Sequence, residues 1–217
     1  DVDVAYASRI YARKPDDLPD AKLFVIYPKA PRETRLGVLS PIEGDRWIVT
    51  LGGWRGDHPP AQEAGFTEFI RGLAIPDLHP IVSKLEPLTD ISVHRYPSNL
   101  RRHYERMARF PEGYAVLGDA VCSFNPIYGQ GMTSSAVQAN ILHKQLKQAA
   151  AHNSLHGIGS NLNRATTIPL RTIWQLATGE DLRYPQVKGN RPPETKFLNA
   201  YVARIHRAVQ HDAFVYD

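Results

Sequence analysis

The first 97 residues alternate between short apolar runs and turn-forming residues. Short apolar runs bounded by Pro and Gly are typical of β-strands. The runs lie at 2–12, 22–27, 36–39 and 47–54. We therefore predict an antiparallel sheet of at least four strands, in which the last two form a hairpin around Glu43-Gly44-Asp45.

Apolar residues at helical spacing follow this region. Phe66, Phe69, Ile70 and Leu73 recur every three or four positions, which predicts a helix over 61–73 that packs on the sheet. A second short helix is predicted at 81–85 and a returning strand at 91–96. We expect His94 and Arg95 of that strand to be exposed or at a sheet edge.

The rest of the chain is predicted to be mainly helical. The predicted elements are a helix at 99–110, a strand at 114–117, and helices at 132–151, 161–178 and 196–210, with a linker at 184–195. The predicted fold class is α/β with α+β character: a mixed, mostly antiparallel sheet with helices on one side. We divide the chain into a β-rich region (1–97), a strand–loop–helix region (98–150) and a C-terminal helical region (151–217).

The segment from Gly118 to Met132 carries the strongest chemical signal. It reads Gly-Asp-Ala-Val-Cys-Ser-Phe-Asn-Pro-Ile-Tyr-Gly-Gln-Gly-Met and precedes a long helical stretch. Its glycines allow a close backbone approach, and the start of the helix offers unpaired N–H groups and a positive dipole end. Asp119 can accept hydrogen bonds from hydroxyl groups. This combination suits a cofactor with a polyol arm and an electron-rich, partly anionic ring.

The same segment resembles the second FAD-binding motif of flavin-dependent aromatic hydroxylases, a superfamily that includes p-hydroxybenzoate hydroxylase, squalene epoxidases and geranylgeranyl-reductase-like enzymes. The shared pattern is Gly-Asp-Ala, a Pro-containing loop, and Gly-x-Gly before a helix. The resemblance implies that Asp119, next to Gly118, bonds the ribityl hydroxyls of FAD and that Pro126 lies beside the isoalloxazine ring. It also implies that the pyrimidine edge of the flavin faces the backbone amides of Gly129, Gln130, Gly131 and Met132.

A second motif of this superfamily is missing from the chain. Its members begin with a strand and a Gly-x-Gly-x-x-Gly turn that binds the ADP part of FAD, and no such string occurs in these 217 residues. We therefore expect the C-terminal half of a longer flavoprotein, whose Rossmann-type N-terminal half is the first partner of this chain. The isolated chain is expected to be inactive.

The activity that the resemblance implies is that of an FAD-dependent monooxygenase. Such an enzyme uses NAD(P)H and dioxygen to hydroxylate or epoxidise an aromatic or polyprenoid small molecule. The cofactor carries the chemistry, so no catalytic side chain is named. Two alternatives stay open: an FAD-dependent reductase of isoprenoid double bonds, and a non-catalytic interaction module derived from a flavoprotein. Substrate identity and the choice between NADH and NADPH are not determined.

The resemblance also implies that the N-terminal sheet roofs a substrate cavity. Four aromatic residues are candidates for lining it: Trp47, Trp54, Tyr27 and Tyr96. For each of them, ordinary packing against the sheet is the favoured interpretation.

Composition narrows the classes of function. A hydrophobic content of 42% and a charged content of 22% are ordinary for a globular protein, and no apolar run reaches about 18 residues. We expect a cytoplasmic protein without a membrane span. Its net charge of +4 is compatible with peripheral association with a membrane surface. The arginines at 101, 102, 106 and 109 are interpreted as a solvated helix face, and no nucleic-acid-binding motif accompanies them.

The cysteine and histidine content points away from disulfide and metal chemistry. Cys122 is the single cysteine, which excludes an internal disulfide, and we interpret it as a small buried filler. The nine histidines form no convergent set with Cys or Glu at metal-ligand spacing, so no metal site is predicted. The oligomeric state stays open, although the amphipathic last helix could form an interface.

Overall fold

The computed structural model describes residues 1–18, 22–209 and 212. The chain forms two compact units. Unit 1 comprises Asp1–Ser98 together with Tyr184–Lys188, and unit 2 comprises Asn99–Arg183 together with the chain from Gly189 onward.

Unit 1 is built on a five-stranded antiparallel sheet in the order β2-β3-β4-β1-β5. Its strands are β1 (Val4–Ala12), β2 (Phe24–Ile26), β3 (Arg35–Ile42), β4 (Arg46–Trp54) and β5 (Ser92–Tyr96). The predicted strands and the β3–β4 hairpin are confirmed. β5 forms one edge of the sheet, where His94 and Arg95 are exposed as predicted.

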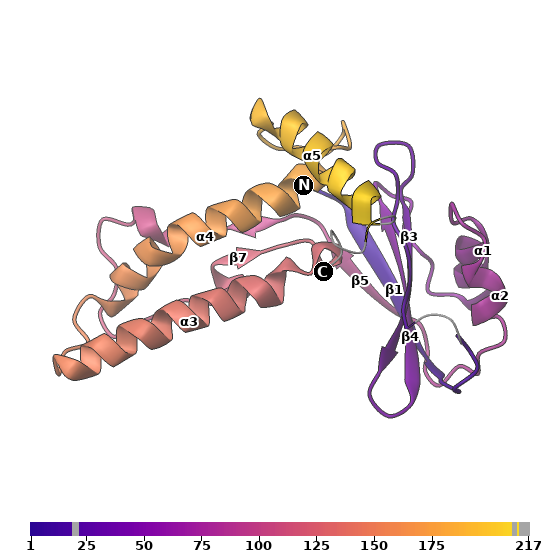
Figure 1. Ribbon diagram of the computed structural model, residues 1–217, viewed down its shortest axis with the longest axis horizontal. Helices are drawn as coiled ribbons and strands as arrows, with labels where there is room; N and C mark the ends of the chain where they lie inside the picture. The colour runs from indigo at the N-terminus through magenta and orange to yellow at the C-terminus, as the bar shows by residue number, and fades with distance from the viewer. Residues whose placement is uncertain (19–21, 210–211, 213–217) are drawn as a thin grey trace. The chain divides into compact units, whose positions relative to one another are not determined.

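Two helices, α1 (Glu63–Arg71) and α2 (Leu78–Val82), cover one face of this sheet (Figure 1). The two predicted helices are thus present, although α2 begins three residues earlier than expected. Leucine side chains from this helical layer pack closely against the sheet at Gly37. A Cβ atom on Gly37 would lie 2.6 Å from Cδ1 of Leu73. The main core of unit 1 therefore lies between the sheet and the helices. Its buried residues include Tyr11, Leu39, Trp47, Val49, Leu51, Phe66, Phe69 and Ile70.

The opposite face of the sheet is only partly covered. Trp54 is buried there and stacks on Tyr184, with 5.9 Å between the ring centroids. Farther along the same face, the hydroxyl groups of Ser8 and Thr50 lie 2.8 Å apart in a half-buried position. Because Trp47 lies in the core on the helix side, the packing interpretation is confirmed for both tryptophans.

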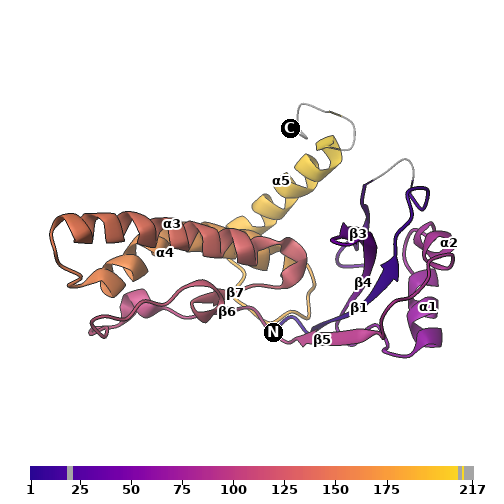
Figure 2. The same cartoon turned by 90° about the horizontal axis from the view of Figure 1, so that it is seen from below.

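Unit 2 is dominated by two long helices that run side by side, α3 (Gln130–Ala151) and α4 (Ile158–Asp181) (Figure 2). The chain then forms α5 (Glu194–Val209); the predicted end of this helix at Gln210 lies outside the described residues. Short elements precede α3. They are the antiparallel pair β6 (Leu100–Arg101) and β7 (Cys122–Ser123), and the 3-10 turns η1 (Tyr104–Arg106), η2 (Gly118–Ala120) and η3 (Pro126–Tyr128).

Two predicted elements of unit 2 are wrong. The expected helix at 99–110 is replaced by β6 and η1, because Leu100 and Arg101 pair with Ser123 and Cys122 of β7. The expected strand at 114–117 is absent, since these described residues belong to no strand. In the first segment, long-range strand pairing overrides the local pattern.

The arginines of the first segment therefore share no helix. Arg101 lies in β6 and Arg106 in η1. Arg102, Arg106 and Arg109 are nevertheless exposed, so the interpretation of this cluster as mainly solvated is confirmed for those three.

Helix α4 continues through Pro169, and it extends beyond the predicted 161–178 at both ends. Proline removes one backbone donor inside a helix. Just before Pro169, the hydroxyl groups of Thr166 and Thr167 donate to the backbone carbonyls of Leu162 and Asn163 over 3.0 Å each. Just after it, Leu170 is buried in the hydrophobic core of unit 2. Tertiary packing thus holds a helix that local propensity weakens.

Candidate functional site

The segment from Gly118 to Met132 folds as a turn, a short strand, a loop and the start of a helix. η2 contains Gly118-Asp119-Ala120, β7 follows, and η3 leads through Gly129 into α3. All seven predicted site residues lie in this segment of unit 2 (118, 119, 126 and 129–132).

The framework of the segment is buried while most of its candidate contact residues face outward. Val121, Cys122, Phe124 and Asn125 have exposed fractions between 0% and 6%. Four of the predicted contact residues are exposed: Asp119, Pro126, Gly129 and Met132. Gly118, Gln130 and Gly131 are half-buried. The buried residues therefore hold the segment in place, and its exposed residues form a surface on which a ligand can lie.

Gly118 begins the turn in a conformation that favours glycine. Its φ is +62°, in the left-handed region. Its N–H donates to Oε1 of Gln138 over 3.1 Å, and Nε2 of Gln138 donates to Oγ of Ser134 over 3.0 Å. Gln138 is 1% exposed. One buried side chain of α3 therefore fixes where Asp119 stands relative to that helix.

The start of α3 is open to a ligand. Gly129 occupies the N-cap position with φ +63° and a backbone that no side chain caps, and the first turn contains no acidic residue. The side chain of Gln130 is bound at this end, since its Nε2 donates to the carbonyl of Tyr128 over 3.1 Å. The first N–H groups of a helix have no intrahelical acceptor and attract negative charge.

Asp119 lies beside this helix start. A Cβ atom on Gly131 would stand 3.9 Å from Oδ1 of Asp119, and one on Gly129 would meet nothing within 4 Å. The structure thus brings together a hydroxyl-accepting carboxylate and an anion-favouring helix end, with glycine on the surface between them.

A buried polar cluster holds the Asn125-Pro126 loop. Oδ1 of Asp181 accepts hydrogen bonds from Nδ2 of Asn125 (3.1 Å) and from the hydroxyl of Tyr128 (2.7 Å). Oδ2 accepts from Nδ2 of Asn99 over 2.6 Å, and Oδ1 of Asn99 accepts from the backbone N–H of Asn125 over 2.6 Å. Asp181 and Asn99 are not among the predicted site residues, because no local pattern links positions 82 residues apart.

Cys122 lies within this segment but offers no reactive thiolate. The side chain is 0% exposed and has no disulfide partner. Burial raises the pKa of the Cys122 thiol to about 12, because the charged form is poorly solvated. Its interpretation as a buried filler is confirmed.

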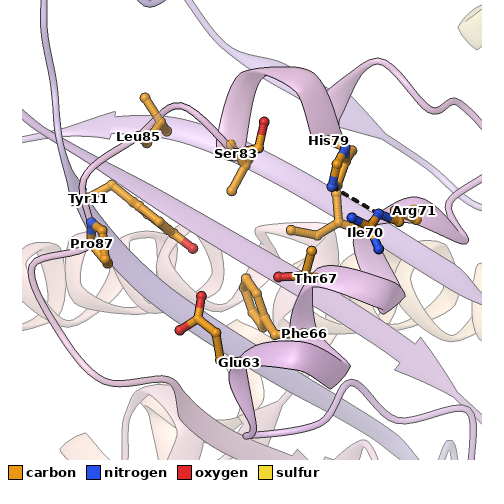
Figure 3. Close-up of a pocket in the computed structure, with 11 residues that line it drawn as sticks. Tyr11, Glu63, Phe66, Thr67, Ile70, Arg71, His79, Ser83, Leu85 and Pro87 are labelled. Carbon is orange, nitrogen blue, oxygen red and sulfur yellow. Dashed lines mark hydrogen bonds between the residues drawn. The ribbon is translucent and has the colours of Figure 1, made fainter.

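Unit 1 contains a separate pocket of about 380 Å³ between α1, α2 and β1 (Figure 3). Its floor is apolar, with Phe66, Ile70 and Val82. Its charged groups are paired: Nε of Arg71 donates to Nε2 of His79 over 3.1 Å, and Glu63 pairs with Arg9. The charged side chains of this pocket therefore pair with neighbouring protein groups.

Within 1–18, 22–209 and 212, no group of three or more His, Cys, Asp or Glu side chains is placed to hold a metal ion. None of the described helices combines the length and the apolar character that crossing a membrane requires.

Comparison with known sequences yields one curated relative. No protein-family model matches the chain. Protein Rv3254 of Mycobacterium tuberculosis is 30% identical over 185 residues, which cover 85% of this chain and 38% of that protein. The chain therefore spans less than two-fifths of the length of the curated relative that it matches.

Comparison with solved structures identifies the fold. The flavin-dependent brominase Bmp2 matches with a TM-score of 0.62 and 14% identity, over 85% of this chain and 45% of that chain. The flavin-dependent halogenase CmlS matches with a TM-score of 0.57 and 15% identity, over 93% and 38%. PqsL, a probable FAD-dependent monooxygenase from Pseudomonas aeruginosa, gives a TM-score of 0.55 and 18% identity, over 84% and 50%.

These structures agree with the resemblance drawn from the Gly118–Met132 segment. The chain has the fold of part of these flavin-dependent enzymes, and it spans between 38% and 50% of the length of the three structures.

Proposed function

We propose that this chain supplies the ribityl- and pyrimidine-facing part of an FAD site in a flavin-dependent monooxygenase. The single observation that carries the proposal is that Asp119 lies beside the uncapped start of α3, close to Gly131 in the first turn of that helix. The residues proposed to contact the cofactor are Gly118, Asp119, Pro126, Gly129, Gln130, Gly131 and Met132.

The donor and acceptor groups at this place fit the chemistry of a flavin. A carboxylate accepts hydrogen bonds from the hydroxyl groups of a ribityl chain, and Asp119 is exposed to receive them. The N–H groups at the start of α3 complement the pyrimidine edge of the ring. At Gly129 and Gly131 the missing side chains leave room for a flat ligand to approach the backbone.

A bound flavin would supply redox chemistry and oxygen activation. The residues of this chain bind and orient the flavin. Asp119 holds the polyol arm, and Pro126, exposed at the loop, shapes the wall beside the ring. The start of α3 stabilises negative charge on the ring by about 0.3 to 2 kcal/mol, the range for a charge at a helix terminus.

For the whole protein we propose NAD(P)H- and dioxygen-dependent hydroxylation or epoxidation of an aromatic or polyprenoid small molecule. The structural neighbours are known as flavin-dependent halogenases and a probable FAD-dependent monooxygenase, which supports oxidative use of the flavin. The partly covered face of the unit 1 sheet is where we expect the substrate. We propose a cytoplasmic location, in keeping with the single cysteine of this chain, which forms no disulfide.

Titration of the full-length protein with FAD tests the site. We expect Asp119→Asn to raise the dissociation constant of FAD about tenfold or more, because a charge-assisted hydrogen bond is lost. Glu112→Gln is the matched control, since it removes an exposed carboxylate elsewhere in unit 2 and should bind FAD like the wild type. Equal affinity of Asp119→Asn and the wild type would remove Asp119 from the site.

The reaction is tested separately with labelled dioxygen. A monooxygenase incorporates one labelled oxygen atom into its product. Reduced product without label would favour the alternative, a reductase of isoprenoid double bonds.

A further inference from the structure

We propose that Asp181 is a positioning residue that sets the Asn125-Pro126 loop, and through it the start of α3, for flavin binding. This inference rests on the proposed function, because it assigns a role to a residue that lies behind the same site. Asp181 is the last residue of α4 and is far from the loop in sequence.

The location of Asp181 is unfavourable for a carboxylate in two respects. Asp181 is only 1% exposed, and burying a charge that has no partners is strongly destabilising. It also stands at the C-terminal end of α4, where the helix dipole disfavours negative charge and the last turn carries no basic residue. Hydrogen bonds must therefore stabilise the carboxylate, and loop residues provide two of them.

The bonds to the loop leave it little freedom. Asn125 donates its side-chain amide to Asp181 and its backbone N–H to Asn99, which itself donates to Asp181. Tyr128 donates its hydroxyl to the same carboxylate oxygen as Asn125. Pro126 lies between these two attachment points, so the carboxylate holds both sides of the residue proposed to flank the flavin ring.

The attachment continues into the start of α3. The carbonyl of Tyr128 accepts from the side chain of Gln130, and the N–H of Gly129 donates to the carbonyl of Pro126 over 3.0 Å. Gly129 is in turn the N-cap of α3. A loop released from Asp181 would therefore change both the wall that Pro126 forms and the approach to the helix end.

Three variants separate this role from general stability. Asp181→Asn keeps the shape of the side chain but removes the charge. It also places an amide N–H donor opposite groups that themselves donate hydrogen bonds to the carboxylate. Tyr128→Phe removes one bond and preserves the ring, and it serves if Asp181→Asn does not fold. Glu180→Gln is the matched control, because it makes the same change of charge one position earlier in α4, where Glu180 pairs with Arg183 and not with the loop.

The experiment measures hydrogen exchange of the peptide spanning 121–130 and FAD affinity, both in the full-length protein. We expect Asp181→Asn and Tyr128→Phe to speed exchange of the loop amides in the flavin-free protein at least tenfold and to raise the dissociation constant of FAD about tenfold, while shifting the absorbance bands of bound flavin. Glu180→Gln should leave all three unchanged.

Each outcome decides one claim. Unchanged exchange in Asp181→Asn and Tyr128→Phe would overturn the attachment of the loop. Faster exchange with wild-type flavin affinity and spectrum would overturn the positioning role. If the wild-type protein binds no FAD at all, the proposed function fails and the positioning role with it, whereas the exchange data still decide whether Asp181 holds the loop.

Discussion

Oδ1 of Asp119 lies 3.9 Å from the point that a Cβ atom on Gly131 would occupy. An ordinary van der Waals distance of this kind means that the fold itself would accept alanine at position 131. The absence of a side chain there is therefore not explained by packing within the described chain. A ligand that lies on this surface would explain it.

Gly131→Ala should therefore separate binding from stability. Position 131 is in the first turn of α3, where alanine is favoured over glycine by about 0.5 to 1 kcal/mol. We expect the melting temperature to stay equal or rise and FAD affinity to fall about tenfold, because the methyl group occupies the surface of approach. Calorimetry and FAD titration on the same preparation check both results. Wild-type affinity would place the flavin elsewhere.

Gln138→Leu should destabilise unit 2 from within. The variant deprives the N–H of Gly118 and the hydroxyl of Ser134 of their partner at a site that is 1% exposed. We expect a loss of about 1 to 3 kcal/mol in the free energy of unfolding, measured by urea denaturation. Gln148→Leu changes an exposed position on the same helix and should lose less than about 0.5 kcal/mol. Equal effects would contradict the role of Gln138.

The pair of Arg35 and Asp57 should give unit 1 a pH-dependent stability. Nε and Nη2 of Arg35 donate to Asp57 over 2.8 to 3.1 Å, and Thr34 donates to the same carboxylate over 2.6 Å. Hydrogen bonding from Arg35 holds the pKa of Asp57 below its ordinary value of 3.8. Because the folded pKa is depressed, this stabilisation is present above pH 3.8 and is lost as pH falls through the folded pKa.

Asp57→Asn should accordingly weaken the chain at neutral pH and flatten its acid response. The expected loss is about 1 to 2 kcal/mol, since the pair is about one-third exposed and partly screened. Urea denaturation between pH 2 and pH 7 measures it. Asp90→Asn, at an exposed position, should keep the wild-type pH profile. A profile of Asp57→Asn that still falls as steeply below pH 4 would assign the acid response to other groups.

Cys122 should be unreactive in the folded protein. With a thiol pKa of about 12, only about one molecule in ten thousand carries the thiolate at pH 8, and the side chain is buried. We expect a chromogenic disulfide reagent to modify one thiol per chain in denaturant and almost none within an hour under native conditions. Rapid native modification would show that the β7 region opens.

The strands of unit 1 and the helices α3 and α4 were predictable because each follows from a local pattern. The Val4–Ala12 and Arg46–Trp54 strands bury alternate residues on the face that α1 and α2 cover. The Gly118–Met132 segment was equally visible, since its turn and helix start depend on glycines close in sequence.

The rest of unit 2 depends on contacts that no local pattern encodes. Leu100 and Arg101 become a strand because Ser123 and Cys122 lie beside them. Residues 114–117 have no partner strand of this kind in the described chain. Asp181 acquires its role from Asn99, Asn125 and Tyr128, which reach it across 53 to 82 positions. The sequence thus shows the surface of the candidate site but not what holds it in place.

The most direct test of the flavin site is an absorbance spectrum, from about 300 to 550 nm, of the purified full-length protein and of this 217-residue chain. Both are incubated with FAD and passed through a desalting column before measurement. We predict flavin bands in stoichiometric amount in the full-length protein, with a clear reduction in its Asp119→Asn variant. Absence of flavin from the full-length protein even after FAD is added would contradict the proposed site and favour an interaction module.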